Sequence, residues 1–138
     1  MSRRFALREH TADVAVEAWG DELGDAFAAA ADGLTAAMCD SVPEAGNTHQ
    51  TEVESESREA ALYDYLDRLI YERDVRGVLP AAHDATVEQE NETWTVTASF
   101  RGVPLDAVAA RDVKAVTYSE MQLERVDGEW RAYVVFDV

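Results

Sequence analysis

The chain has 138 residues, 47% of them hydrophobic, which fits one globular domain over residues 1–138 and not a disordered chain. Its 28 acidic side chains against 12 basic ones give a formal net charge of −16, which disfavours direct binding to nucleic acid, because phosphate contacts need clustered Lys and Arg. With one cysteine, no apolar run of about 20 residues and no signal-like N-terminus, we expect a reduced, cytoplasmic protein without a membrane span.

Residues 14–19 predict the first strand, because apolar side chains alternate with others along it. The stretch that follows predicts a helix with Asp21 as its N-cap. Gly24 and Gly33 weaken the intrinsic propensity of this helix, so packing has to hold it. Its apolar residues recur as one buried stripe, which contains Leu23, Phe27, Ala30, Leu34, Ala37 and Met38.

A second amphipathic helix is predicted at residues 58–75, and Gly77 and Pro80 are expected to end it. Before it, Pro, Gly and Asn mark residues 41–50 as a loop, and the alternation in 51–57 predicts a half-solvated strand. The apolar face of the helix contains Leu62, Tyr65, Leu66, Leu69 and Ile70.

The remaining chain is rich in predicted strands. Two hairpins are expected, 84–90 with 93–100 around Asn91–Glu92, and 113–126 with 129–138 around Asp127–Gly128. Between them, residues 101–112 are expected to be irregular or to form a short helical turn. The predicted fold class is therefore α+β, a single domain in which two amphipathic helices pack on mostly antiparallel strands.

Acidic residues at both ends of the chain are the first candidates for chemistry. His10 and Asp13 stand at the mouth of the first strand, where the alternative is a turn in which the aspartate caps backbone N–H groups. The last strand runs to Val138, so the Asp137 side chain and the terminal carboxylate are neighbours. Two neighbouring carboxylates repel unless a cation or proton intervenes, and Ca²⁺ or Mg²⁺ takes such oxygen ligands. A solvated acidic tail is the alternative.

A second candidate is the segment around Lys114, the only lysine of the chain. A lysine kept in an arginine-rich chain is explained by a specific contact of its compact ammonium, or by an ordinary solvated strand position. Tyr118, four residues later, fits packing better than acid–base chemistry. No nucleophile elbow and no glycine-rich phosphate loop is present in the sequence.

Taken together, these stretches resemble the archease family. The resemblance covers nearly the whole length, in the family's order, and is carried by EHTADVAVEAWG, LGDAFAAAADGLTAAMCD, LYDYLDRLIYERD, DVKAVTYSEM and the terminal VVFDV. It implies a non-catalytic accessory protein of an RtcB-family RNA ligase, the enzyme that joins RNA ends in tRNA splicing. Such an activator promotes guanylylation of a histidine of the ligase, allows repeated turnover and broadens nucleotide use beyond GTP. RNA would be met only through the ligase.

The resemblance also implies a bound divalent cation, calcium in the family, with Mg²⁺ or Mn²⁺ as alternatives. Its implied ligands are Asp13, Asp137 and the terminal carboxylate of Val138. His10 would lie beside the metal or face a partner, because imidazole is a poor ligand for calcium. Lys114, and with it Tyr118, is expected to face the ligase or its nucleotide. Ser119 stands where many relatives have histidine, so a role of that histidine does not carry over.

Two other functions and one environmental expectation complete the predictions. A general chaperone or protein modulator would act through an apolar face, and a small metal-dependent hydrolase would use His10 as its base. The charge of −16 resembles the surface of a salt-in halophile, since the Debye length falls to about 3 Å in molar salt and screens the repulsion. An acidic mesophilic protein is the alternative.

Overall fold

A computed structural model describes residues 3–10 and 13–138, except for the side chains of Glu9 and His10. The helices are α1 (Leu23–Met38) and α2 (Arg58–Arg76), and a 3-10 turn covers Leu105–Ala107. The strands are β1 (Arg3–His10), β2 (Asp13–Gly20), β3 (Asn47–Ser55), β4 (Val78–Glu90), β5 (Thr93–Pro104), β6 (Ala115–Val126) and β7 (Glu129–Asp137).

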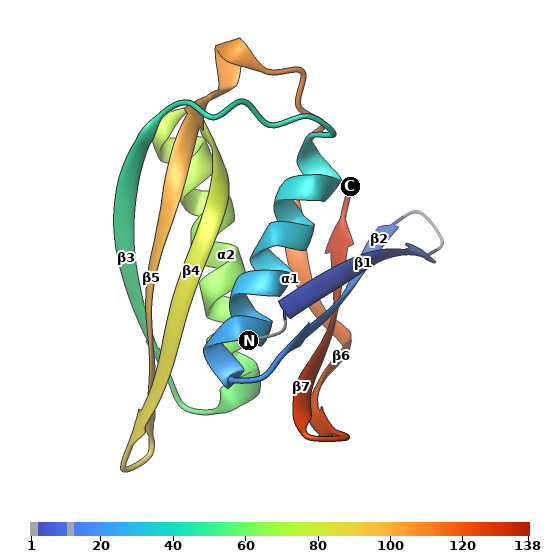
Figure 1. The fold of residues 1–138 in the computed structure, drawn as a ribbon, viewed down its shortest axis with the longest axis vertical. Coiled ribbons are helices and arrows are strands. Elements are labelled where there is room, and N and C mark those ends of the chain that lie inside the picture. Colours follow the sequence, from blue (N-terminus) through green and yellow to red (C-terminus); the bar gives the residue numbers. More distant parts are fainter. Residues whose placement is uncertain (1–2, 11–12) are drawn as a thin grey trace.

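The strands form two sheets with the helices between them (Figure 1). Sheet A has the order β1-β2-β7-β6 and sheet B the order β3-β5-β4, and every pairing is antiparallel. Helix α1 packs against β2 and β4, while α2 packs against β6 and β3, so each helix touches both sheets. The expected α+β class, with two helices on antiparallel strands, is confirmed.

Helix α1 is buried on more sides than its sequence indicates. Twelve of its 16 residues are buried, because the helix lies between two sheets and seven of its residues are alanines, whose side chains are small enough to fit there. The prediction of a single buried stripe is therefore too narrow. Its N-cap is Glu22, and not Asp21, because Glu22 and Asp25 form a reciprocal capping box.

Helix α2 confirms its prediction closely. Ser57 caps its start by accepting a hydrogen bond from the backbone N–H of Ala60. Gly77 ends it in the left-handed conformation, at φ 65°, which glycine adopts without strain. Its outer side remains exposed, in contrast to α1.

Both hairpin turns are confirmed, but several strand limits differ from the predictions. Strand β1 was not predicted, and the loop assigned to 41–50 is wrong from Asn47 onward, where β3 begins. Strand β4 begins at Val78 and contains Pro80, which an edge strand tolerates because one side of it forms no ladder. A bulge follows, where Ala82 has φ 51°.

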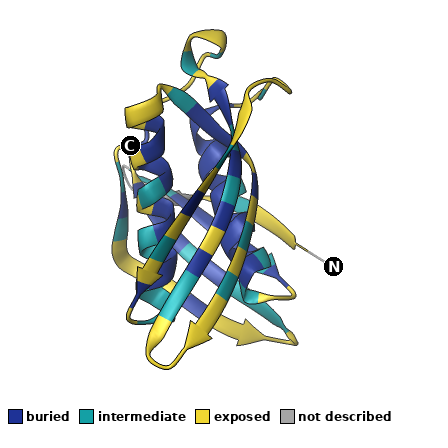
Figure 2. Cartoon of the chain, turned by 90° about the vertical axis from the view of Figure 1, so that its left-hand side faces the viewer, coloured by how far each residue is buried: buried dark blue, intermediate teal, exposed yellow. Residues whose placement is uncertain are grey.

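Sheet B shows the alternation that places the core. In Figure 2, buried and exposed residues alternate along its strands. The buried hydrophobic ones belong to the core that also contains residues of both helices. A single cluster of buried residues joins both sheets and both helices. His83 belongs to this interior, and its Nε2 lies 2.8 Å from the Thr35 hydroxyl of α1.

Candidate functional site at one end of sheet A

Strands β2 and β7 bring Asp13 and Asp137 together. The two residues are directly opposite each other, as are Val14 and Phe136. Phe136 is buried in the core, so the alternating positions of Asp13 and Asp137 lie on the outer face of sheet A. Side chains directly opposite on antiparallel strands have Cβ atoms about 4.5–5.5 Å apart. The first predicted strand therefore lies beside the C-terminal one, the arrangement that the implied ligands Asp13 and Asp137 require.

The chemistry of this pair fits part of a site for a hard cation. Like charges directly opposite each other destabilise a sheet, whereas carboxylate oxygens are ligands that Ca²⁺ prefers. No group of three or more His, Cys, Asp or Glu side chains among the described residues is placed to hold a metal ion. Further donors would be water, main-chain oxygens or the carboxylate of Val138, which directly follows β7 and is exposed.

The structure describes the backbone of His10 but not its side chain. His10 ends β1 and stands directly opposite Asp13 in the β1–β2 register. Its side chain, and Thr11 and Ala12 entirely, lie outside the described residues. The role of His10 beside a metal or at a partner, and the alternative of an Asp13-capped turn, therefore stay predictions.

Lys114 reaches the same end of the sheet through its backbone. Its N–H donates to the carbonyl oxygen of Asp137 at 2.8 Å, and its side chain is exposed. All eleven arginines make a hydrogen bond, an ion pair or an aromatic contact: Arg3, Arg4, Arg8, Arg58, Arg68, Arg73, Arg76, Arg101, Arg111, Arg125 and Arg131. Over the described ranges 3–10 and 13–138, Lys114 is the one basic residue whose charged group makes no such contact.

The profile of the family described as Archease protein family (MTH1598/TM1083) matches residues 5–138. The chain belongs to the archease family. Protein archease of Thermococcus gammatolerans is 35% identical over 99% of both chains. The solution structure of Methanobacterium thermoautotrophicum protein 1598 has a TM-score of 0.86 at 29% identity, over 97% of this chain and 98% of that one. A Thermotoga maritima archease, described as a possible chaperone, shares the fold with a TM-score of 0.60 at 24% identity, over 95% and 94%.

Two arginines fix the loop of this archease that leads into Lys114. Arg111 donates from its backbone to Met38 at 2.6 Å and from its Nε to the Ala37 carbonyl at 3.0 Å, at the end of α1. Arg73 of α2 donates from Nη1 to the Val113 carbonyl at 2.7 Å. Sequence reasoning missed both anchors, because their acceptors are backbone carbonyls, which carry no residue-specific pattern.

Tyr118 has the packing role that was predicted for it. Its ring stacks on Tyr63 of α2, with centroids 4.2 Å apart and planes within 2°. Burial raises the pKa of Tyr118, and the nearby carboxylates of Asp64 and Glu59 raise it further. Ser119 follows, exposed, in a bulge where the β6–β7 register shifts between Thr117 and Gln122.

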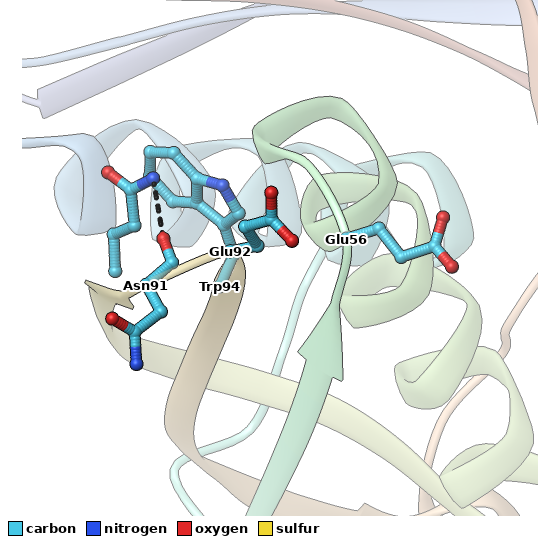
Figure 3. Close-up of a pocket in the computed structure, with 5 residues that line it drawn as sticks. Glu56, Asn91, Glu92 and Trp94 are labelled. Atoms are coloured by element: carbon cyan, nitrogen blue, oxygen red, sulfur yellow. Dashed lines mark hydrogen bonds between the residues drawn. The ribbon is translucent and has the colours of Figure 1, made fainter.

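The hollow in Figure 3 does not add a second centre. It measures about 430 Å³ and lies where the β4–β5 hairpin meets the start of α2. The Gln89 amide donates to the Asn91 carbonyl at 3.2 Å, and Glu56 extends away from Glu92. Its carboxylates do not converge on one point.

In the described part of the chain, no helix is long and apolar enough to cross a membrane.

Proposed function

We propose that this archease is a non-catalytic activator of an RtcB-family RNA ligase. It promotes guanylylation of the ligase's histidine, supports repeated turnover and broadens the choice of nucleotide. Family membership over residues 5–138 supports this assignment. The net charge of −16 supports a protein partner over direct RNA binding.

One observation carries the proposal: three segments far apart in the sequence meet at one end of sheet A. They supply Asp13, Asp137 and Lys114, through the β2–β7 register and the backbone hydrogen bond of Lys114. Two carboxylates beside a lysine whose ammonium contacts no described residue form a surface that can bind a cation and an anionic group at once. In the proposal, Lys114 faces the ligase or the nucleotide that the ligase uses.

The residues at this end of sheet A would hold a divalent cation, of which calcium fits the all-oxygen donors best. The proposed ligands are Asp13, Asp137 and the Val138 carboxylate, and the backbone of His10 lies directly opposite Asp13. When bound, the cation supplies charge neutralisation between the facing carboxylates. Asp13 and Asp137 then keep the ends of β2 and β7 in register, so binding and local order are coupled.

The experiment is multiple-turnover RNA ligation by the cognate ligase with GTP and Mn²⁺, with the archease at sub-stoichiometric amounts. The intact chain is expected to restore turnover, and Asp137→Asn to lose most of that effect. Asp127→Asn, in the β6–β7 turn where Asn is equally suited, is the matched control and should behave like the intact chain. If the intact chain leaves the rate unchanged, the activator assignment is wrong.

Calcium binding is measured separately by titration calorimetry on the isolated protein. Asp137→Asn should weaken binding by about tenfold or more, as expected when one of few charged ligands is lost. One glycine added after Val138 should also weaken binding if the carboxylate of Val138 is a ligand. Calcium affinity unaffected by both changes would remove these residues as ligands.

General chaperone activity is a second candidate, because the Thermotoga maritima relative is described as a possible chaperone and Tyr71, Val75 and Tyr118 are exposed here. It predicts suppression of aggregation of a heated protein unrelated to RNA, without any effect of Asp137→Asn. Turnover of RNA or nucleotides without the ligase would instead support the hydrolase.

A further inference from the structure

The three most exposed large apolar side chains among the described residues lie on helix α2 and on strand β6, which packs against it. We call this surface the α2–β6 face and define it by Tyr63, Asp67, Tyr71 and Val75 of α2 and Tyr118 of β6. Val75, Tyr71 and Tyr118 are 63%, 54% and 53% exposed, more than any other large hydrophobic side chain among the described residues. Scattered exposed apolar residues need no explanation, but a group of the three most exposed ones indicates contact with another molecule.

The aromatic residues of this face are already held in place. Tyr118 stacks in parallel on Tyr63, which fixes one of its ring faces and leaves the rest of the ring exposed. The guanidinium of Arg68 lies 5.4 Å from the ring centre of Tyr71, so a cation already sits over that ring. Rigid tyrosines lose little conformational entropy on binding and are frequent anchors in interfaces.

The charge around these rings is negative. Asp67 forms no hydrogen bond or ion pair within the described part of the chain, and Asp64 and Glu59 lie close enough to Tyr118 to act on its hydroxyl. Arg68 and Arg76 share the buried Glu72, and Arg58 lies 3.8 Å from Glu59, which leaves Asp64 and Asp67 without a basic partner among the described residues. Aromatic faces beside carboxylates suit a guanidinium, which stacks on the ring and donates to the acid.

We propose that the α2–β6 face docks an arginine-bearing, basic surface of the protein partner, with Tyr71 and Tyr118 as stacking anchors. The inference rests on the proposed function, in which the partner is an RNA ligase, since an enzyme that binds RNA has to present basic residues to the phosphates. Tyr118 of the edge strand β6 follows Lys114, which directly precedes that strand, by four residues, a separation of about 13 Å. One partner can therefore contact this face and the carboxylate end of sheet A together.

The test is the dissociation constant between the archease and its cognate ligase, measured by titration calorimetry. Tyr71→Ser and Tyr118→Ser are each expected to weaken binding by about tenfold or more, as for buried aromatic anchors. Val126→Ser is the matched control, because Val126 is exposed but lies at the far end of β6, and it should bind like the intact chain. Asp67→Lys, an exposed position that tolerates substitution, should weaken binding by charge repulsion alone.

The outcomes separate the two proposals. If the intact chain does not bind the ligase at all, both the proposed function and this inference are wrong. If the intact chain binds and activates while Tyr71→Ser, Tyr118→Ser and Asp67→Lys bind as tightly, the function stands and the docking face is wrong. If sedimentation shows a dimer that only these variants disrupt, with ligase affinity unchanged, the face binds a second copy and the inference is overturned.

Discussion

The outer faces of the two sheets use the same acidic composition in different ways. On sheet A, Glu17 accepts hydrogen bonds from Arg8 and from Arg131, each at 2.7 Å, and Arg4 pairs with Glu129 at 3.0 Å. These pairs tie β1, β2 and β7 together across the surface. Burial raises the pKa of Glu17, but the hydrogen bonds from the two arginines outweigh it and hold the pKa below its ordinary value.

On sheet B most exposed carboxylates have no ion-pair partner among the described residues, and Asp84, 3.8 Å from Arg3, is the exception. Glu52 and Glu54 of β3 and Glu88 and Glu90 of β4 are exposed on either side of the threonines of β5, and none of the four forms an ion pair with a described residue. Sheet A therefore uses charge to fix strand positions near the candidate site, while sheet B uses it for hydration. The halophilic environment stays a prediction, and sheet B is the surface that such an environment would affect most.

The largest expected effect comes from the place where α1 touches both sheets. A Cβ on Gly24 would overlap the carbonyl oxygen of Ala85 in sheet B, and one on Gly33 would overlap the Val16 side chain in sheet A. Helix propensity alone predicts that Gly→Ala stabilises by about 1 kcal/mol. We expect the reverse, a loss of about 3 kcal/mol for each variant in urea unfolding, because a packed interface cannot absorb the methyl group.

The control for these variants is Gly77→Ala, which has open space around it but a φ of 65°. It should cost only about 1–2 kcal/mol, the strain of a left-handed residue with a side chain. Equal effects at Gly24 and Gly33 would show that α1 is held as tightly by one sheet as by the other. Stabilisation by Gly24→Ala would contradict the close approach of α1 to sheet B.

The inner side of sheet B carries the next prediction, at His83. Burial lowers the pKa of His83 to about 3, and its Nδ1 has no hydrogen-bond partner among the described residues. The unfolded chain binds a proton at this histidine below about pH 6.5, whereas the folded chain does not until about pH 3. The stability that the neutral ring supports is therefore full above pH 6.5 and is lost as the pH falls toward 3.

This loss has a maximal slope of about 1.4 kcal/mol per pH unit. Urea unfolding at several pH values between 6.5 and 4.5 measures it for the intact chain and for His83→Gln, whose side chain does not titrate. His83→Gln should have a lower free energy of unfolding at pH 7. Its free energy of unfolding should also change less with pH than that of the intact chain, by up to about 1.4 kcal/mol per pH unit. Identical slopes would show that His83 takes up its proton in the folded state.

Features set by local sequence were predictable, whereas features set by tertiary contacts were not. The α2 boundaries, with Ser57 before and Gly77 after, were predictable because local capping and periodicity set them. Strand β1 was not, because its exposed Phe5 and Leu7 give it little burial, and its pairing with β2 defines it. The burial of α1 was underestimated because an alanine-rich helix shows no contrast between its faces.

The candidate site was predictable in part. The resemblance to archeases brought Asp13 and Asp137 together, and the β2–β7 register agrees with that placement. The anchoring of the loop before Lys114 by Arg73 and Arg111 was not predictable, since both reach backbone carbonyls from distant helices and loops. No spacing in the sequence encodes which arginines form contacts. Nor does it encode that the ammonium of Lys114 forms none with the described residues, because such contacts exist only in the folded chain.

The smallest expected effects compare the two outer faces directly. Glu17→Gln should destabilise the fold by about 1–3 kcal/mol at neutral pH, because Arg8 and Arg131 lose a charged acceptor. Glu52→Gln should raise the melting temperature slightly in dilute buffer, since it removes repulsion among unpaired carboxylates, and the gain should vanish in molar salt, where charges are screened within about 3 Å. Thermal unfolding of both variants at low and molar salt checks the opposite signs. A Glu52→Gln variant that is less stable than the intact chain in dilute buffer would mean that the carboxylates of sheet B contribute to folding as those of sheet A do.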